Sequence, residues 1–129
     1  MDTLTAFGRA LSDPTRIRIL NALRQSELCV CELVDALGVS QSTLSTHLQL
    51  LRSNGMVVVE KRQTWNIYSI ATDARGAIDH AFESFPSNDI RLASDQERIE
   101  NRIRLRIDGC CVVGFGVLQK KEETIYVNN

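Results

Sequence analysis

Little in the sequence sets it apart from ordinary globular proteins. Of its 129 residues two are histidine, two are proline and four are cysteine, and aromatic side chains make up 5%. No apolar run approaches the roughly 18–20 residues that span a bilayer. The N-terminus lacks the basic-then-apolar pattern of a secretory signal. With 15 basic and 16 acidic residues, the net charge of −1 indicates no global field that attracts nucleic acid.

The sequence does contain enough apolar residues to build a core. Hydrophobic residues make up 43% of the chain and charged residues 24%, which excludes a disordered chain. We expect a cytoplasmic protein with no membrane contact, in which thiols stay reduced. The length suits one domain, and we expect it to occupy residues 1–107, with a thiol-containing tail over residues 108–129.

The first third of the chain carries the signals of two helices. A short helix is expected over residues 3–11. Asp13 is a typical N-cap residue and Pro14 suits the first helical position, where the missing N–H costs nothing. These signals predict a second helix that runs to about Arg24.

Two further helices follow in quick succession. Cys29 precedes a helix in which Glu32 can reach back to the cap N–H, and Gly38 ends this helix. Ser40 caps the next helix, which Asn54 stops. Two short helices joined by a turn that contains glycine predict a helix-turn-helix.

Strand signals come directly after it. Residues 56–62 are β-branched and then charged, and residues 65–70 alternate like a partner strand. The connection at residues 63–64 lacks an Asn-Gly or Asp-Gly turn signal. A helix-turn-helix followed by a β-hairpin predicts a mainly α winged helix-turn-helix with the hairpin as its wing.

The signals weaken after this hairpin. Residues 73–85 are expected to form a helix, and Ser94 with Glu97 predicts a capping box that opens a charge-rich helix to about residue 107. Ile99 and Ile103 give that helix a narrow apolar stripe, which favours packing on a partner. We therefore expect a homodimer with terminal helices at its interface.

The second helix of the predicted motif carries many short hydrogen-bonding side chains. Serine and threonine are mediocre helix formers, and they are useful where bases and phosphates approach closely. The alternative is a polar face that only meets solvent. The wing adds two cations for backbone or minor-groove contact. The predicted DNA-binding residues are Gln41, Ser42, Thr43, Ser45, Thr46, His47, Lys61 and Arg62.

Cys29 and Cys31 form the first candidate ligand pair. Residues two apart on an ideal helix point about 200° from each other, so they cannot hold one ion. At the N-cap, however, the backbone is not helical, and the Cys29 sulfur can turn toward that of Cys31. The helix dipole there favours thiolate. The alternative is a poor cap beside a small buried residue.

Two sulfurs do not complete a site for a soft ion. Trivalent arsenic or antimony takes three thiolates, whereas cadmium, lead or zinc takes four ligands. Cys110 and Cys111 are the other thiols, and one of them is expected to supply a further ligand. The alternative for this pair is an incidental apolar tail. His80 stands alone beyond the wing, near Asp79 and Glu83, which argues against a zinc site.

Three stretches together resemble the ArsR/SmtB family of winged-helix repressors. They are Asp13 to Leu20, the block Glu27 to Leu33, and Ser40 to Leu48, which leads on to Gly55. The resemblance covers roughly residues 4–72. It implies homodimers that bind double-stranded operator DNA and leave it when a metal or metalloid ion binds.

Within that resemblance, the Leu-Cys-Val-Cys-Glu-Leu stretch is similar to the thiolate motif of arsenic, antimony, cadmium and lead sensors. Some family members add C-terminal thiol ligands. The chain departs from the arsenical branch at Val34, where another cysteine is frequent, and at Thr46, where a basic residue is frequent. We expect a repressor with no permanent cofactor that As(III), or Sb(III), releases from DNA.

Two alternatives keep the fold and change the signal. The same cysteines could serve a repressor that responds to Cd(II) or Pb(II), or one that senses oxidants or reactive sulfur through a disulfide between a helix cysteine and a tail cysteine. An enzyme is disfavoured, because the sequence lacks a Cys-x-x-Cys motif, a βαβ pattern and a phosphate-binding loop.

Overall fold

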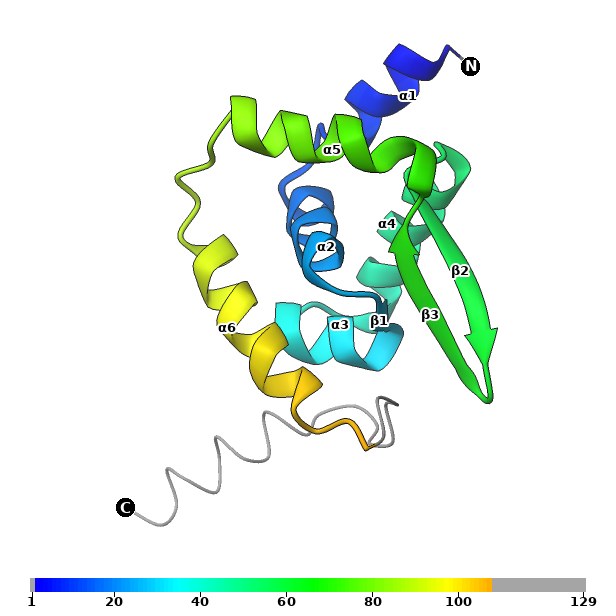
Figure 1. The fold of residues 1–129 in the computed structure, drawn as a ribbon, viewed down its shortest axis with the longest axis vertical. Coiled ribbons are helices and arrows are strands. Elements are labelled where there is room, and N and C mark those ends of the chain that lie inside the picture. The colour runs from blue at the N-terminus through cyan, green and yellow to red at the C-terminus, as the bar shows by residue number, and fades with distance from the viewer. Residues whose placement is uncertain (1, 108–129) are drawn as a thin grey trace.

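A computed structural model describes residues 2–107, and Figure 1 shows their arrangement. The fold is the predicted winged helix-turn-helix: α3 and α4 form the motif, and β2 and β3 form the wing. No helix in this part of the chain is long and apolar enough to cross a membrane. The elements are α1 (Thr3–Ala10), α2 (Pro14–Gln25), β1 (Leu28–Cys29), α3 (Val30–Leu37), α4 (Gln41–Ser53), β2 (Val57–Arg62), β3 (Trp65–Ile70), α5 (Thr72–Ser84) and α6 (Arg91–Ile103).

The helix boundaries follow the predicted caps. The Asp13 carboxylate accepts the backbone N–H groups of Thr15 and Arg16 at 2.8 and 3.1 Å, and Pro14 takes the first helical position. Gly38 ends α3 in the left-handed conformation, with φ of 66°. Since a side chain disfavours that conformation, glycine allows the tight turn into α4.

The wing belongs to a three-stranded antiparallel sheet with the order β1-β3-β2. Arg62 pairs with Trp65 across the hairpin, so residues 63–64 form its turn, and Gln63 has a φ of 56°. Strand β1 was not predicted. It pairs with β3 so that Cys29 lies opposite Ile67. The segment before α3 is thereby part of the wing sheet.

The larger of the two apolar clusters among the described residues lies under the motif. Ile19, Leu20 and Leu23 of α2 are at most 1% exposed, and they pack with the inward faces of α3 and α4. Figure 1 shows α2 in the middle of the fold, with α5 across one end and the wing at one side. This core fixes α4 relative to the rest of the domain.

Helix α6 differs from its prediction in its start, its end and its apolar stripe, and it ends at Ile103 where the prediction ran to about residue 107. It begins at Arg91, so Ser94 lies inside it and the predicted Ser94–Glu97 capping box is wrong. Asp89 accepts the Arg91 N–H at 3.0 Å and orders the chain before Ser94. Ile99 is fully buried in the chain's own core, so this stripe is not free for a partner.

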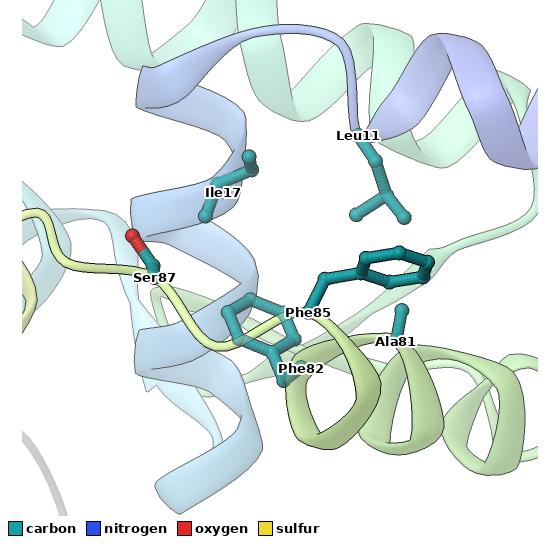
Figure 2. Close-up of a pocket in the computed structure, with 6 residues that line it drawn as sticks. All are labelled: Leu11, Ile17, Ala81, Phe82, Phe85 and Ser87. Atoms are coloured by element: carbon teal, nitrogen blue, oxygen red, sulfur yellow. The ribbon is translucent and has the colours of Figure 1, made fainter.

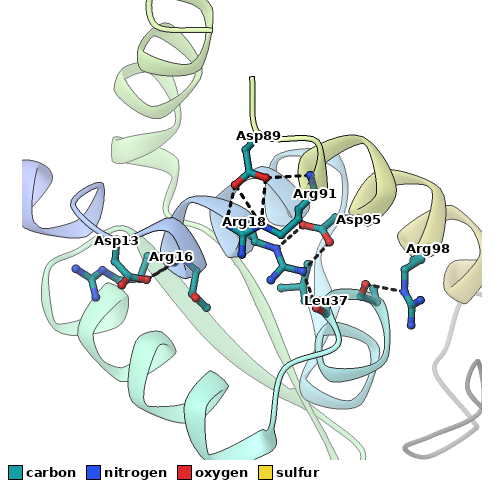
Figure 3. A network of polar contacts seen from close by, with 10 residues as sticks. Asp13, Arg16, Arg18, Leu37, Asp89, Arg91, Asp95 and Arg98 are labelled. Atoms are coloured by element: carbon teal, nitrogen blue, oxygen red, sulfur yellow. Dashed lines mark hydrogen bonds and ion pairs between the residues drawn. The ribbon is translucent and has the colours of Figure 1, made fainter. Parts of the chain in front are cut away.

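Polar contacts hold α6 against α2 and α3 (Figure 3). Both carboxylate oxygens of the buried Asp95 accept from the Arg18 guanidinium at 2.8 Å, and Arg18 also donates to the Leu37 carbonyl at 2.6 Å. Arg98 donates to the Ala36 carbonyl at 3.1 Å. The arginine side chains therefore add polar contacts to the narrow apolar stripe in holding α6 against α2 and α3.

Candidate nucleic-acid interface and paired-cysteine site

Helix α4 presents the predicted contact residues on its outer face. Leu44, Leu48 and Leu51 anchor the helix in the core. Most of the predicted contact residues on α4 face outward, which is the arrangement a groove-reading helix needs. Those that are exposed are Gln41, Ser42, Thr43, Ser45 and Thr46.

Local hydrogen bonds separate these side chains into two groups. Ser40 caps the helix by accepting the Thr43 N–H, and its hydroxyl donates to the Thr43 hydroxyl at 2.9 Å. The Thr46 hydroxyl donates to the Ser42 carbonyl at 3.0 Å. Within residues 2–107, the Gln41 and Ser45 side chains form no such bond, so they are the ones best placed to contact bases.

His47 lies half-buried between α4 and α2. Its Nδ1 is 3.2 Å from the Arg16 guanidinium, and its Nε2 is 3.8 Å from the Asp13 carboxylate. Arg16 also donates to the carbonyls of Arg9 and Ala10 in the last turn of α1. His47 thus joins the motif to the first two helices. Its predicted contact with DNA stays a prediction.

The two wing cations have different surroundings. Arg62 donates to both carboxylate oxygens of Glu27, at 2.5 and 3.1 Å, and to Glu60 at 2.9 Å. The hydrogen bonds to Glu27, and to a smaller extent the one to Glu60, raise the pKa of the Arg62 guanidinium. Lys61 is exposed and has no ion-pair partner among the described residues. Lys61 is therefore the wing cation that is open to a phosphate.

The two sulfurs of Cys29 and Cys31 meet, as the N-cap argument predicts. Cys29 has extended angles of −84° and 168°, and its Sγ lies 3.0 Å from that of Cys31. Both cysteines are buried, with exposed fractions of 0% and 2%. Trp65 and Ile67 of the wing pack against the pair. That the pair binds an ion stays a prediction.

Glu32 is the charged group nearest in sequence to these sulfurs. It is 1% exposed and accepts the Cys29 N–H at 3.0 Å, which confirms the predicted capping box. Arg106 donates to both oxygens of the same carboxylate, at 2.7 and 2.9 Å. Burial raises the pKa of the Glu32 carboxyl, but the bonds from Arg106 and Cys29 outweigh it and lower the net pKa.

Cys110 and Cys111 fall outside the described residues. Within residues 2–107 no cluster of three or more histidine, cysteine or acidic side chains is arranged to hold a metal ion. His80 bonds to the Ser84 hydroxyl at 3.2 Å, and Asp79 pairs with Arg24.

Sequence reasoning missed three residues around the thiol pair. Glu27 pairs with the wing, Trp65 covers the sulfurs, and Arg106 binds Glu32 from α6's end. Only Trp65 carried a usable signal, because strand alternation places it on the same face as Ile67. The contacts of Glu27 and Arg106 cross 35 and 74 positions of sequence, which no local pattern reveals.

An apolar pocket of about 250 Å³ opens between α1, α2 and α5 (Figure 2). Phe85 lines this pocket and is 81% exposed. Large exposed apolar side chains around a pocket are typical of a protein–protein interface. The lining residues are Leu11, Ile17, Ala81, Phe82, Phe85 and Ser87.

Residues 13–59 match the family model described as bacterial regulatory protein, arsR family. The chain is 33% identical over 104 residues to the arsenic resistance transcriptional regulator ArsR1 of Pseudomonas putida, covering 74% of this chain and 81% of that one. It is 46% identical over 71 residues to the transcriptional repressor SmtB of Mycobacterium tuberculosis, covering 55% of this chain and 53% of that protein.

A solved structure supports the same relationship. The homodimeric winged helix-turn-helix DNA-binding domain of a Mycobacterium bovis protein matches with a TM-score of 0.59 and 30% identity. The match covers 64% of this chain and 77% of that domain.

Proposed function

This chain belongs to the arsR family of bacterial regulatory proteins, which are transcriptional regulators and not enzymes, and on that basis we propose its specific role. It is a homodimeric repressor that binds operator DNA and leaves it when As(III), or Sb(III), binds cysteine thiolates. The observation that carries the proposal is the 3.0 Å approach of the Cys29 and Cys31 sulfurs at the start of α3.

The DNA-binding part of the proposal rests on α4 and the wing. Gln41 and Ser45 read base edges in the major groove, where amides and hydroxyls can both donate and accept. Lys61 contacts a phosphate, and Arg62 joins it when the Glu27 contact yields to DNA. Phosphate contacts set affinity and position, whereas base contacts set sequence preference.

The homodimer uses the apolar pocket between α1 and α5. Exposure of the apolar Phe85 side chain to water is unfavourable, and a two-fold contact over the pocket buries both copies of it. The homodimeric M. bovis domain supports a dimer, and Figure 2 shows Phe85 beside the other apolar residues that line this pocket. Two α4 helices about one DNA turn apart then reach two half-sites.

The thiol pair suits a soft trivalent ion. Two sulfurs that share an ion through bonds of about 2.3 Å at a tetrahedral angle lie about 3.8 Å apart, so the observed pair needs to open by less than 1 Å. Each thiol that binds arsenite replaces one hydroxyl and releases one water. Arsenic stays trivalent throughout, and no oxidant or reductant is consumed.

A tail cysteine supplies the third sulfur. The Arg106–Glu32 pair holds the end of the described chain beside the N-terminus of α3. Cys110 is four residues further on, and four residues span at most about 14 Å. One of Cys110 and Cys111 is therefore close enough along the chain to complete a three-thiolate set with Cys29 and Cys31.

The decisive experiment titrates reduced protein on its own promoter with As(III), Sb(III), Cd(II), Pb(II) and Zn(II). We expect release by the trivalent ions first, and loss of that release in Cys29→Ser and Cys31→Ser. Serine is a good N-cap but a hard, poorly ionised ligand, so these variants keep their DNA affinity.

Two results would replace this proposal. Release by Cd(II) or Pb(II) at much lower concentration than As(III) would identify a divalent-ion sensor. Release by peroxide or persulfide without any ion would identify the thiols as a redox switch. A protein with both serines that still responds to the same As(III) concentration would remove Cys29 and Cys31 from the site.

A further inference from the structure

We infer that an ion bound at Cys29 and Cys31 acts on DNA binding through the wing: it displaces β3 and the wing cations, and the affinity for DNA falls. This inference rests on the proposed function and deepens it, because it names the element through which the ion acts. Three independent contacts join the cysteine segment to the wing.

The first contact is a shared sheet. Cys29 is in β1, and β1 pairs with β3, so Cys29 lies opposite Ile67 and Leu28 opposite Tyr68. Strand β3 is the middle strand and pairs with β2 along the whole hairpin. A displacement of Cys29 is therefore passed to β3 through backbone hydrogen bonds.

The second contact is made by side chains. The partly buried apolar residues that pack on the sulfurs, Trp65 and Ile67, both come from β3. They share one face of that strand because side chains alternate. Close-packed interiors do not yield a fraction of an ångström without moving neighbours. Opening the sulfur pair to admit an ion must therefore push on the wing.

The third contact is electrostatic. Glu27 lies two residues before Cys29 and holds the Arg62 guanidinium through both oxygens. Arg62 is the last residue of β2, next to the exposed Lys61. The segment that carries the thiol therefore also holds a cation at the DNA-binding end of the wing. Moving this segment changes where the wing's positive charge can be placed.

The tryptophan provides a direct readout, because Trp65 is the only tryptophan in the chain. Arsenite is added to the reduced full-length protein while Trp65 emission is recorded, and bound arsenic is measured by equilibrium dialysis. We expect the emission to change in proportion to arsenic bound. Cys29→Ser should show neither binding nor the change.

A variant then separates ion binding from its effect. Trp65→Ala removes the side chain that covers the sulfurs, and Asn66→Ala is the matched control, exposed on the same strand and one position along. The measurement is the ratio of operator affinities without and with arsenite. Coupling of this kind usually changes affinity about 5- to 150-fold. We expect Trp65→Ala to bring the ratio toward one, and Asn66→Ala to keep it.

The outcomes distinguish this inference from the proposed function. If wild-type protein binds no arsenite, the proposed function fails and this inference fails with it. If arsenite binds and releases the operator while Trp65 emission stays constant and Trp65→Ala keeps the full ratio, only the wing route is overturned. Trp65→Phe retains the ring packing and should keep the ratio, which guards against a folding defect in the alanine variant.

Discussion

Arg106 holds both carboxylate oxygens of Glu32, while the same carboxylate accepts the backbone N–H of Cys29. One buried anion thus links the end of the described chain to the cap of α3. A carboxylate that is 1% exposed is costly unless it is paired, and here it is paired on two sides. The cysteine segment owes its position to this group as well as to the sheet.

Replacing Glu32 with glutamine should destabilise the domain. The variant leaves the Arg106 guanidinium without its anion, and losing one partner of a buried pair costs about 3–5 kcal/mol. Urea unfolding of the reduced protein measures the change. Glu97→Gln, an exposed change on α6, is the control and should stay within about 0.5 kcal/mol of wild type. Equal stability of the two variants would contradict the role assigned to Glu32.

The same pair predicts a pH dependence. The pKa of Glu32 is lowered in the folded state from its ordinary value of 4.5, so the ionised carboxylate stabilises the fold above that value. As pH falls from about 4.5 through the lower folded pKa, this contribution is lost. The stability difference between wild type and Glu32→Gln should therefore be constant near neutrality and shrink in acid. A difference that grows in acid would reverse the assigned sign.

Substitutions in α4 and in the wing should affect DNA binding in different ways. Ser45→Ala should weaken operator binding by about 1–3 kcal/mol and leave binding to random DNA unchanged, because a base contact is lost. Lys61→Gln should weaken binding to both DNAs and reduce the salt dependence by about one phosphate contact. Fluorescence anisotropy at several salt concentrations measures both. Unchanged discrimination in Ser45→Ala would move base reading away from this residue.

The dimer is proposed to form at the exposed edge of the apolar pocket, where Phe85 lies. Phe85→Glu places a charge where two copies are proposed to meet, and it should shift sedimentation from dimer to monomer. Val58→Thr changes another exposed apolar residue, on the wing, and should leave the dimer intact. A dimer that persists in Phe85→Glu would place the interface elsewhere.

The tail cysteines are expected to substitute for one another. Cys110→Ser and Cys111→Ser alone should each reduce the As(III) response slightly, whereas the double change should nearly abolish it. Arsenic-edge absorption should count three sulfurs per arsenic in wild type and two in the double variant. Three sulfurs in the double variant would require a ligand from outside this set.

The local parts of the fold were predictable from sequence. Caps such as Asp13 and Ser40, and the glycine at position 38, act over a few residues, so their patterns give helix ends directly. The meeting of the Cys29 and Cys31 sulfurs followed from the same local reasoning. The start of α6 was predicted wrongly because Ser94 and Glu97 have the spacing of a capping box. Asp89 accepts the Arg91 N–H instead, and the helix begins three residues before Ser94.

The contacts between distant segments were not predictable in this way. Strand β1 has two residues, too few for a periodic pattern, and it exists because β3 offers it a free edge. Arg18, Arg98 and Arg106 look like solvent-facing charges in sequence, yet each bonds to groups on other elements. Such pairings depend on the tertiary arrangement and become visible only with it.

The burial of both sulfurs also limits the rate at which the protein can bind the ion. An ion cannot reach thiols that are 0% and 2% exposed until the residues packed on them, Trp65 and Ile67 of the wing, move aside, so each capture waits for a local opening. At low ion concentration the capture rate rises with concentration. At high concentration it levels off at the opening rate, which belongs to the protein alone. The rate of induction therefore has an upper limit, which is set by how tightly Trp65 and Ile67 pack on the sulfurs.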